Sequence, residues 1–268
     1  MSAVSITSVI SMICYLLAGV LVLRQFFGQA QDNKNTKVAQ GSLMLGIAIH
    51  LSILILSIQQ IDGEKLSLTF VLATLAWLVS ASMYMLNKLI KNIVFLPIVC
   101  FLSALFVFLH LIFPATTGID SSMNSGVIAH ITLSILAFGI LGISMLYALQ
   151  LSYINYQLKH KRKTMLHSDL PPLLLVEDIL YKLMLLGTLI LAASLISGFV
   201  FVPNMFAEGY AHKTTLSTVA LLTFISALIF HHKKGLKARH AIIVNVVGIA
   251  FLSLAYFGSR IVQEVIIG

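Results

Sequence analysis

The sequence predicts an all-α integral membrane protein, a bundle of eight transmembrane helices with the N-terminus and the C-terminus on the extracytoplasmic side. Of its 268 residues, 59% are hydrophobic and 10% are charged, whereas soluble domains carry about 25% charged residues. Apolar runs recur along the whole chain at roughly 20 residues, the length that crosses a bilayer. Lysine and arginine gather in alternate connections between these runs, and this pattern sets the orientation.

Eight apolar runs define the predicted spans. They lie near residues 4–26, 38–59, 66–86, 93–113, 126–151, 179–201, 215–230 and 241–262. Pro97 falls in an early turn of the fourth span, and Pro114 and Pro203 follow the fourth and the sixth, where helices tolerate or end at proline. The connections are short, so we expect residues 1–268 to form a single transmembrane domain with any chemistry among the helices or at their outer ends.

The longest connection joins the fifth and sixth spans. Its first part, Ser152–Lys163, is predicted as a basic continuation of the fifth helix, and Ser168–Pro172 forms a break. After the break, residues 173–182 are predicted as a cytoplasmic interfacial helix that leads into the sixth span.

Positive charge orients the bundle, because cytoplasmic loops retain lysine and arginine. One set of helix ends and connections carries nearly all of them: Arg24, Lys34, Lys37, Lys88, Lys91, Lys159, Lys161, Arg162, Lys163, Lys182, Lys233, Lys234, Lys237 and Arg239. The opposite side has Lys65, Lys213 and Arg260. The net charge of +8 is therefore mostly a topology signal. We expect anionic membrane lipid as a partner and no binding of nucleic acid.

The acidic residues and cysteines argue against several classes of membrane enzyme and transporter. All nine carboxylates fall in loops or near helix ends, whereas ion-coupled transporters usually place one at the membrane midplane and aspartyl intramembrane proteases need a pair inside the bilayer. Cys14 and Cys100 stand alone in apolar runs, without a Cys-x-x-Cys motif. No catalytic residue emerges, and we expect the protein not to be an enzyme.

Histidine is the ionisable residue inside the predicted spans. His50 lies about halfway along the second span, while His110 and His130 lie within about one turn of the outer ends of the fourth and fifth. Ionisable groups at such positions are costly and indicate a functional site unless they are hydrogen-bonded within the bundle. Taken singly, each of these histidines is also explained by an interhelical hydrogen bond.

Small residues share the helical faces of His50 and His130, as expected of positions inside a bundle. These residues are Gly46 and Ser57 in the second span, and Ser134 and Ala137 in the fifth. His110 instead has Phe106 and Phe113 at helical spacing, a pattern typical of an apolar or lipid-facing stripe.

Pairs of small residues at helical spacing predict closely packed helices. The clearest are Ser194 with Gly198 and Gly139 with Gly142. Such pairs let two backbones approach each other, which indicates packing rather than chemistry.

Imidazole groups without thiolates or carboxylates nearby do not make a typical calcium, magnesium or structural zinc site. They can, however, serve as ligands of haem iron. We predict haem b as the cofactor, with His130 and His50 as its axial ligands. The haem propionates need cations at the outer boundary, and Lys65, Lys213 and Arg260 are the candidates. Arg260 also fits a solvated pair with Glu264, four residues on.

The C-terminal half resembles the cytochrome c assembly (CcsA/CcmC-type) superfamily of haem-handling membrane proteins, most closely its short, eight-helix YpjD/HemX-like branch. The residues that carry the resemblance are Leu170-Pro-Pro-Leu, Glu177, Gly187, Ser197-Gly198, Lys213 and Asn245 to Gly258, which ends Ala-Tyr-Phe-Gly. For the short branch it extends over nearly the whole chain and includes Leu96-Pro-Ile and Ala148-Leu-Gln-Leu.

The resemblance implies a bundle with an outward N-terminus and a link to haem transport or cytochrome c biogenesis. His130 matches the extracytoplasmic haem-ligand histidine of family members, and His50 matches a second-helix histidine of the short branch. The family's outer loop is rich in tryptophan, but the equivalent segment here, Glu208–Thr215, contains none, and the family's second outer histidine has no counterpart. We therefore do not expect cytochrome c synthase activity, and His212 is a candidate replacement ligand.

Three functions are compatible with these features. The first is a haem-binding or haem-handling protein of the bacterial inner (plasma) membrane, auxiliary to cytochrome c biogenesis. The second is a non-catalytic scaffold that binds another membrane protein and has lost the haem chemistry. The third, a transporter of a hydrophobic solute, has no positive feature in the sequence.

Overall fold

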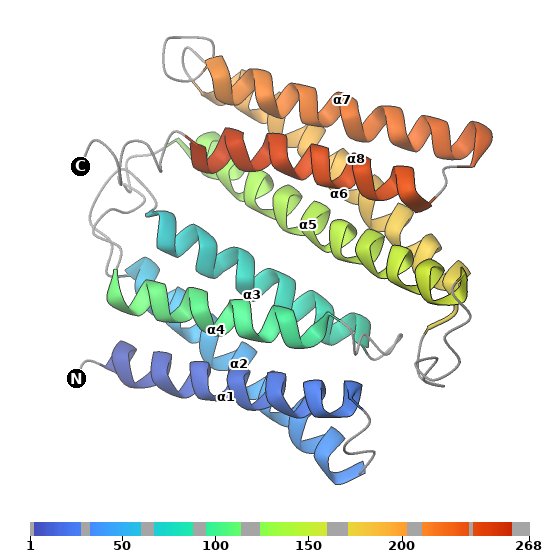
Figure 1. Cartoon of the computed structure of the whole chain (residues 1–268). Helices are drawn as coiled ribbons and strands as arrows, with labels where there is room; N and C mark the ends of the chain where they lie inside the picture. The colour runs from blue at the N-terminus through green and yellow to red at the C-terminus, as the bar shows by residue number, and fades with distance from the viewer. Residues whose placement is uncertain are drawn as a thin grey trace. The chain divides into compact units, whose positions relative to one another are not determined.

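Eight α-helices make up most of the described structure, which confirms the all-α prediction. The computed structural model describes residues 3–27, 33–59, 67–87, 95–113, 124–159, 171–202, 211–235 and 238–258. The helices are α1 (Ala3–Phe26), α2 (Asn33–Gln59), α3 (Leu68–Asn87), α4 (Leu96–Ile112), α5 (Ser125–Lys159), α6 (Leu173–Phe201), α7 (Ala211–Lys234) and α8 (Ala238–Ser253), and α8 continues as one π-helical turn, η1 (Leu254–Gly258) (Figure 1).

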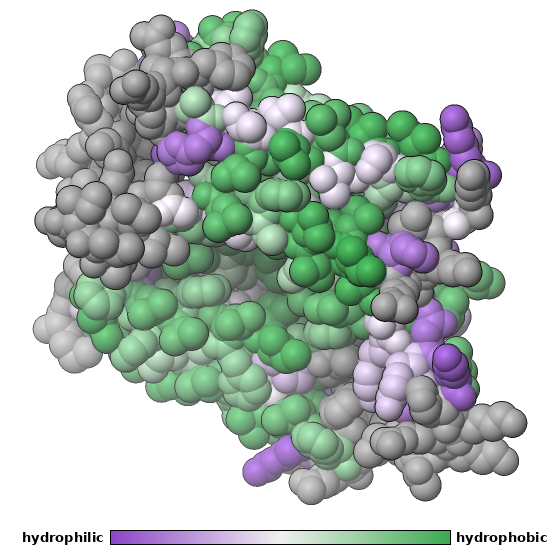
Figure 2. Space-filling view, turned by 45° about the horizontal axis from the view of Figure 1, so that its top comes forward, coloured by the Kyte–Doolittle hydropathy of each residue, from purple (hydrophilic) through white to green (hydrophobic). Residues whose placement is uncertain are grey.

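The length and the exposed side chains of the helices are those expected of helices surrounded by lipid. Within the described residues, seven are long and apolar enough to cross a membrane, and α4 is a shorter apolar helix of 17 residues. Large hydrophobic side chains point outward along them, with Leu174 78% and Phe199 72% exposed. Figure 2 shows hydrophobic side chains over most of the described surface in that view. Water does not favour such exposure, whereas lipid tails do.

The sixth helix corrects one prediction. The sixth span was predicted to start at residue 179, after an interfacial helix over residues 173–182, whereas α6 runs as one helix of 29 residues from Leu173 to Phe201. Pro172 stands immediately before its first turn, a position that suits proline, and neither glycine nor proline follows until Gly187. The predicted basic continuation of the fifth helix is present as far as Lys159.

The helices fall into two compact units. The first comprises residues 1–122 with 169–171, and the second residues 123–168 with 172–268. In the first unit α1 packs against α2 and α4, and α3 packs against the same two helices. The indole N–H of Trp77 in α3 donates to the carbonyl of Ile47 in α2 at 3.1 Å. The single-domain organisation stays a prediction.

In the second unit, α5 packs against α6 and α8, and α7 packs against the same two helices. Ser194 and Gly198 are buried, as expected for a close contact. A Cβ atom on Gly187 would lie 2.7 Å from Cγ of Leu141 in α5, so only glycine fits there without movement. Gly139 is buried, whereas Gly142 faces open space, and the second predicted small pair is therefore only half correct.

Candidate functional site

His130 lies in the first turns of α5 and is bonded to the backbone of α6. Its Nδ1 is 2.8 Å from the carbonyl oxygen of Ser194. The Ser197 hydroxyl donates to the same oxygen at 2.8 Å and lies 3.5 Å from the ring nitrogen. One turn further along α5, the hydroxyls of Ser134 and Ser194 are 2.6 Å apart. The imidazole of His130 is half-buried, so part of it is reachable from outside the second unit.

His50 faces the interior of the first unit, as its small neighbours in sequence predict. It is 0% exposed, and its Nδ1 lies 3.2 Å from the Tyr15 hydroxyl of α1. One turn away on α2, the Gly46 carbonyl accepts a bond from the Ser11 hydroxyl at 3.0 Å. The other ring nitrogen of His50, Nε2, has no hydrogen-bond partner within the described residues.

His110 corrects a second prediction, because it does not lie on a lipid-facing stripe. It is 5% exposed, its Nε2 is 2.9 Å from the Ser57 hydroxyl of α2, and its ring packs edgewise on Phe70 of α3. An imidazole facing lipid tails would lack a hydrogen-bond partner, and Ser57 supplies one inside the unit. The Nδ1 atom of His110 has no partner in the described part of the chain.

The first unit therefore contains two buried imidazoles, those of His50 and His110. Only His50 was predicted from the sequence as a site residue. The available signal was Ser57, which follows His50 by two helical turns and shares its face of α2. Nothing in the sequence of α4 points to this contact.

The other predicted site residues are distributed as follows. His50 belongs to the first unit and His130 to the second. His212 is exposed in the first turn of α7, next to Lys213. The start of α7 lies at the same end of the second unit as the start of α5 (Figure 1). Arg260 and Lys65 lie outside the described residues. Across the described ranges, no three His, Cys, Asp or Glu side chains gather as a metal site.

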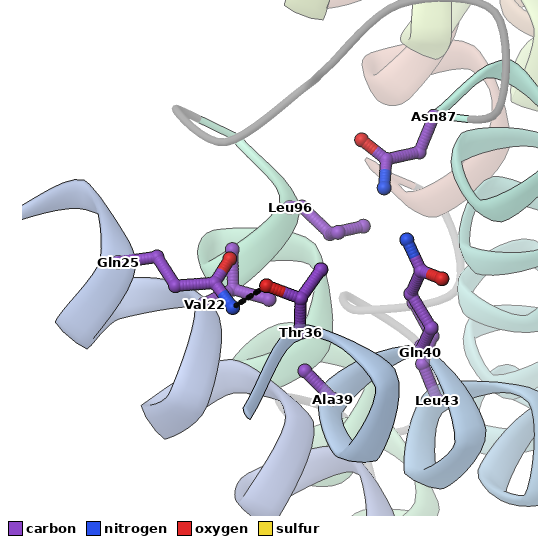
Figure 3. A pocket seen from close by; sticks show the side chains of 8 residues that line it. All are labelled: Val22, Gln25, Thr36, Ala39, Gln40, Leu43, Asn87 and Leu96. Atoms are coloured by element: carbon purple, nitrogen blue, oxygen red, sulfur yellow. Dashed lines mark hydrogen bonds between the residues drawn. The ribbon is translucent and has the colours of Figure 1, made fainter. Parts of the chain in front are cut away.

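A small pocket opens in the first unit near the C-terminal end of α1. Its volume is about 30 Å³, and its lining side chains come from all four helices of the unit: Val22, Gln25, Thr36, Ala39, Gln40, Leu43, Asn87 and Leu96. The Gln25 amide donates to the Thr36 hydroxyl at 3.0 Å, and the Gln40 and Asn87 amides point toward each other (Figure 3). This space suits one or two water molecules and is too small for a macrocycle.

Comparison with known proteins supports the resemblance seen in the sequence. The family model described as "Cytochrome C assembly protein" matches residues 63–267, which include His110, His130 and α5 to α8 but not His50. "Inner membrane protein YpjD" of Escherichia coli (strain K12) is 33% identical over 205 residues, 76% of this chain and 78% of its own length.

An "Uncharacterized 28.8 kDa protein in nifR3-like 5'region" of Azospirillum brasilense is 28% identical over 144 residues, 52% of each chain. No solved structure matches the chain. The family model covers far more than half of the sequence, and the helices are those of a membrane protein. The chain therefore belongs to the cytochrome c assembly protein family.

Proposed function

We propose that this protein binds and handles haem in the bacterial inner membrane, as an auxiliary of cytochrome c biogenesis without synthase activity. Family membership supports the link to haem, and the Escherichia coli relative is described as an inner membrane protein. The segment Glu208–Thr215 has no tryptophan, which argues against synthase chemistry.

The accessibility of His130 carries the proposal. Of the three histidines that the sequence places inside the predicted spans, His50 and His110 are buried, while His130 is half-exposed near the end of α5 and lies in the region that the family model matches. One of its ring nitrogens is bonded to α6, and the other has no hydrogen-bond partner among the described residues. Because His130 is only partly buried, we expect a haem to reach its imidazole more readily than those of His50 and His110.

His50 is the proposed second axial ligand. Its Nε2 atom is buried and has no partner within the described residues, which is unusual because buried polar groups are nearly always hydrogen-bonded. For a haem to reach it, the first unit must open around α2, since the ring is 0% exposed. The Nδ1 atom of His110 is also buried without a partner in the described part of the chain, so His110 is an alternative second ligand.

The remaining groups have supporting roles in the proposal. Lys213 and Arg260 would pair with the propionates, Lys65 is a further cation for them, and His212 would serve as an alternative ligand. Two imidazoles would supply the iron with a strong axial field, and the apolar helices would shield the macrocycle from water. We propose that both termini face the extracytoplasmic side, with anionic lipid bound at the basic ends.

Haemin titration of the purified protein tests the proposal. We expect one haemin per chain, with a sharp Soret band and resolved α and β bands on reduction. His130→Ala should weaken binding at least tenfold, and His50→Ala should convert the spectrum from six-coordinate to five-coordinate. His232→Ala, which removes an exposed histidine near the end of α7, serves as the matched control.

The outcomes separate the ligands. If His110→Ala rather than His50→Ala changes the coordination, the second ligand is wrong. If the wild-type protein takes up no haemin, or if His130→Ala binds it as tightly, the haem proposal fails.

A scaffold function is the second candidate. It is favoured by the hydrogen bonds that fix His50 to Tyr15 and His110 to Ser57, because buried histidines of this kind stabilise helix packing. A membrane-protein partner that co-purifies stoichiometrically with both the wild type and His130→Ala, together with an absence of haem, would support it.

A further inference from the structure

One backbone carbonyl in the second unit receives two side-chain hydrogen bonds. The oxygen of Ser194 lies 2.8 Å from Nδ1 of His130, across the α5–α6 contact. The hydroxyl of Ser197, on the same helix as Ser194, donates to this oxygen at 2.8 Å. Most carbonyls within a helix accept only the backbone N–H four residues on, so this oxygen is unusually well supplied with donors.

The acceptor determines the tautomer of His130. A carbonyl oxygen only accepts hydrogen bonds, so Nδ1 must carry the ring proton. A neutral imidazole has one N–H, and its lone pair therefore lies on Nε2. This is the arrangement of metal-binding histidines, which coordinate through one nitrogen and donate from the other to a carbonyl or carboxylate.

A second bond holds the carbonyl in place. The Ser194 side chain contacts Ser134 at 2.6 Å, and both residues are buried, at 2% and 4% exposure. Since Ser134 follows His130 by one turn of α5, two side chains of that helix bind the same residue of α6. The glycine at position 187 lets the two backbones approach further along the contact.

Ser197 also affects the strength of the His130 bond. Because its hydroxyl shares the Ser194 oxygen, that oxygen accepts less strongly from Nδ1–H. A weaker bond at Nδ1 leaves the imidazole a poorer electron donor at Nε2, and second-shell partners of this kind tune the potential of a bound iron.

We propose that Ser194 and Ser197 are positioning residues that hold His130 as the Nδ1–H tautomer, with Nε2 as the coordinating atom. Ser194 supplies the accepting carbonyl oxygen, and Ser197 weakens the hydrogen bond that this oxygen accepts from Nδ1–H. The role of Nε2 toward iron rests on the proposed function, whereas the tautomer does not.

The tautomer is measured without haem. In protein carrying ¹⁵N-labelled histidine in detergent micelles, two-bond ¹⁵N–¹H correlations identify the protonated ring nitrogen, and His130→Gln assigns the signal. We expect protonation at Nδ1 in the wild type, and a mixed population in Ser194→Ala, which loses the bond to Ser134. Protonation of His130 at Nε2 in the wild type would overturn the proposal.

The effect of Ser197 is measured with haem bound. We expect Ser197→Ala to shift the midpoint potential downward, because the freed carbonyl strengthens the Nδ1–H bond, and Ser197→Thr to restore the wild-type value. Ser226→Ala is the matched control, since that exposed hydroxyl also bonds a carbonyl three residues back in its own helix, that of Thr223 at 2.8 Å. An unchanged potential in Ser197→Ala, or an equal shift in Ser226→Ala, would overturn the moderating role.

The two experiments distinguish their failures. If no haem binds but His130 is protonated at Nδ1 in the wild type and mixed in Ser194→Ala, the proposed function fails while the positioning role of Ser194 stands; an unchanged tautomer in Ser194→Ala would overturn that role. If haem binds through His130 and the free protein carries the proton on Nε2, the positioning role fails while the proposed function stands.

Discussion

Substituting Gly187 by alanine tests whether the close approach of α5 and α6 supports the His130 site. The new Cβ would lie 2.7 Å and 2.8 Å from Cγ and Cδ2 of Leu141, and 3.3 Å from Cγ2 of Ile140. Leu141 is 0% exposed, and we expect its close-packed surroundings to resist rotation of its side chain. The two helices must therefore separate slightly, which stretches the bond between His130 and the Ser194 carbonyl.

The magnitude follows from a comparison with Gly142 of α5. Replacing a helical glycine by alanine stabilises a helix by about 1 kcal/mol. At Gly142, where no heavy atom lies within 4 Å of the added Cβ, only this gain applies. Overpacking a tight contact costs about 1–3 kcal/mol. Gly187→Ala should therefore be about 1–3 kcal/mol less stable than Gly142→Ala.

The assay is reversible unfolding of both variants in mixed micelles with increasing SDS, followed by circular dichroism. Haem affinity measured on the same samples should fall in Gly187→Ala and stay at the wild-type value in Gly142→Ala. Equal unfolding free energies for the two variants would refute the inference that this contact is tight.

Three further outcomes are expected. Tyr15→Phe should lower the unfolding free energy by about 1–2 kcal/mol, because Nδ1 of His50 loses its partner; an unchanged value would contradict that bond. Cys14 and Cys100 are both buried, and neither should react with a maleimide until SDS is added. Because the two native cysteines should not react, a cysteine introduced by Lys159→Cys can be followed alone, and it should be labelled only from the cytoplasmic side. Labelling of this variant in intact cells by an impermeant maleimide would contradict the orientation.

The helices could be predicted from the sequence, because the length and the hydropathy of a membrane span are local properties of the chain. It also placed His50 inside a bundle, since Gly46 and Ser57 share its face and the structure confirms that orientation. The boundary before α6 was misjudged because the acidic residues Glu177 and Asp178, in the second turn of the helix, resemble an interfacial segment although the backbone continues without a break.

The environment of His130 and His110 was not predictable in the same way. The group that binds His130 is the backbone carbonyl of Ser194, and a backbone carbonyl has no sequence signature. The partner of His110 is Ser57 on another helix, and the phenylalanines near His110 in its own helix gave the opposite indication. Both contacts depend on which helices pack together, which hydropathy does not encode.

The absorption spectrum of the protein, purified from haem-sufficient cells, shows directly whether the protein binds haem through His130. We expect a Soret band with close to one haem per chain for the wild type and for His232→Ala, and a loss of most of that absorbance in His130→Ala at equal protein yield. A colourless wild-type protein, or a His130→Ala variant with an undiminished Soret band, would contradict it.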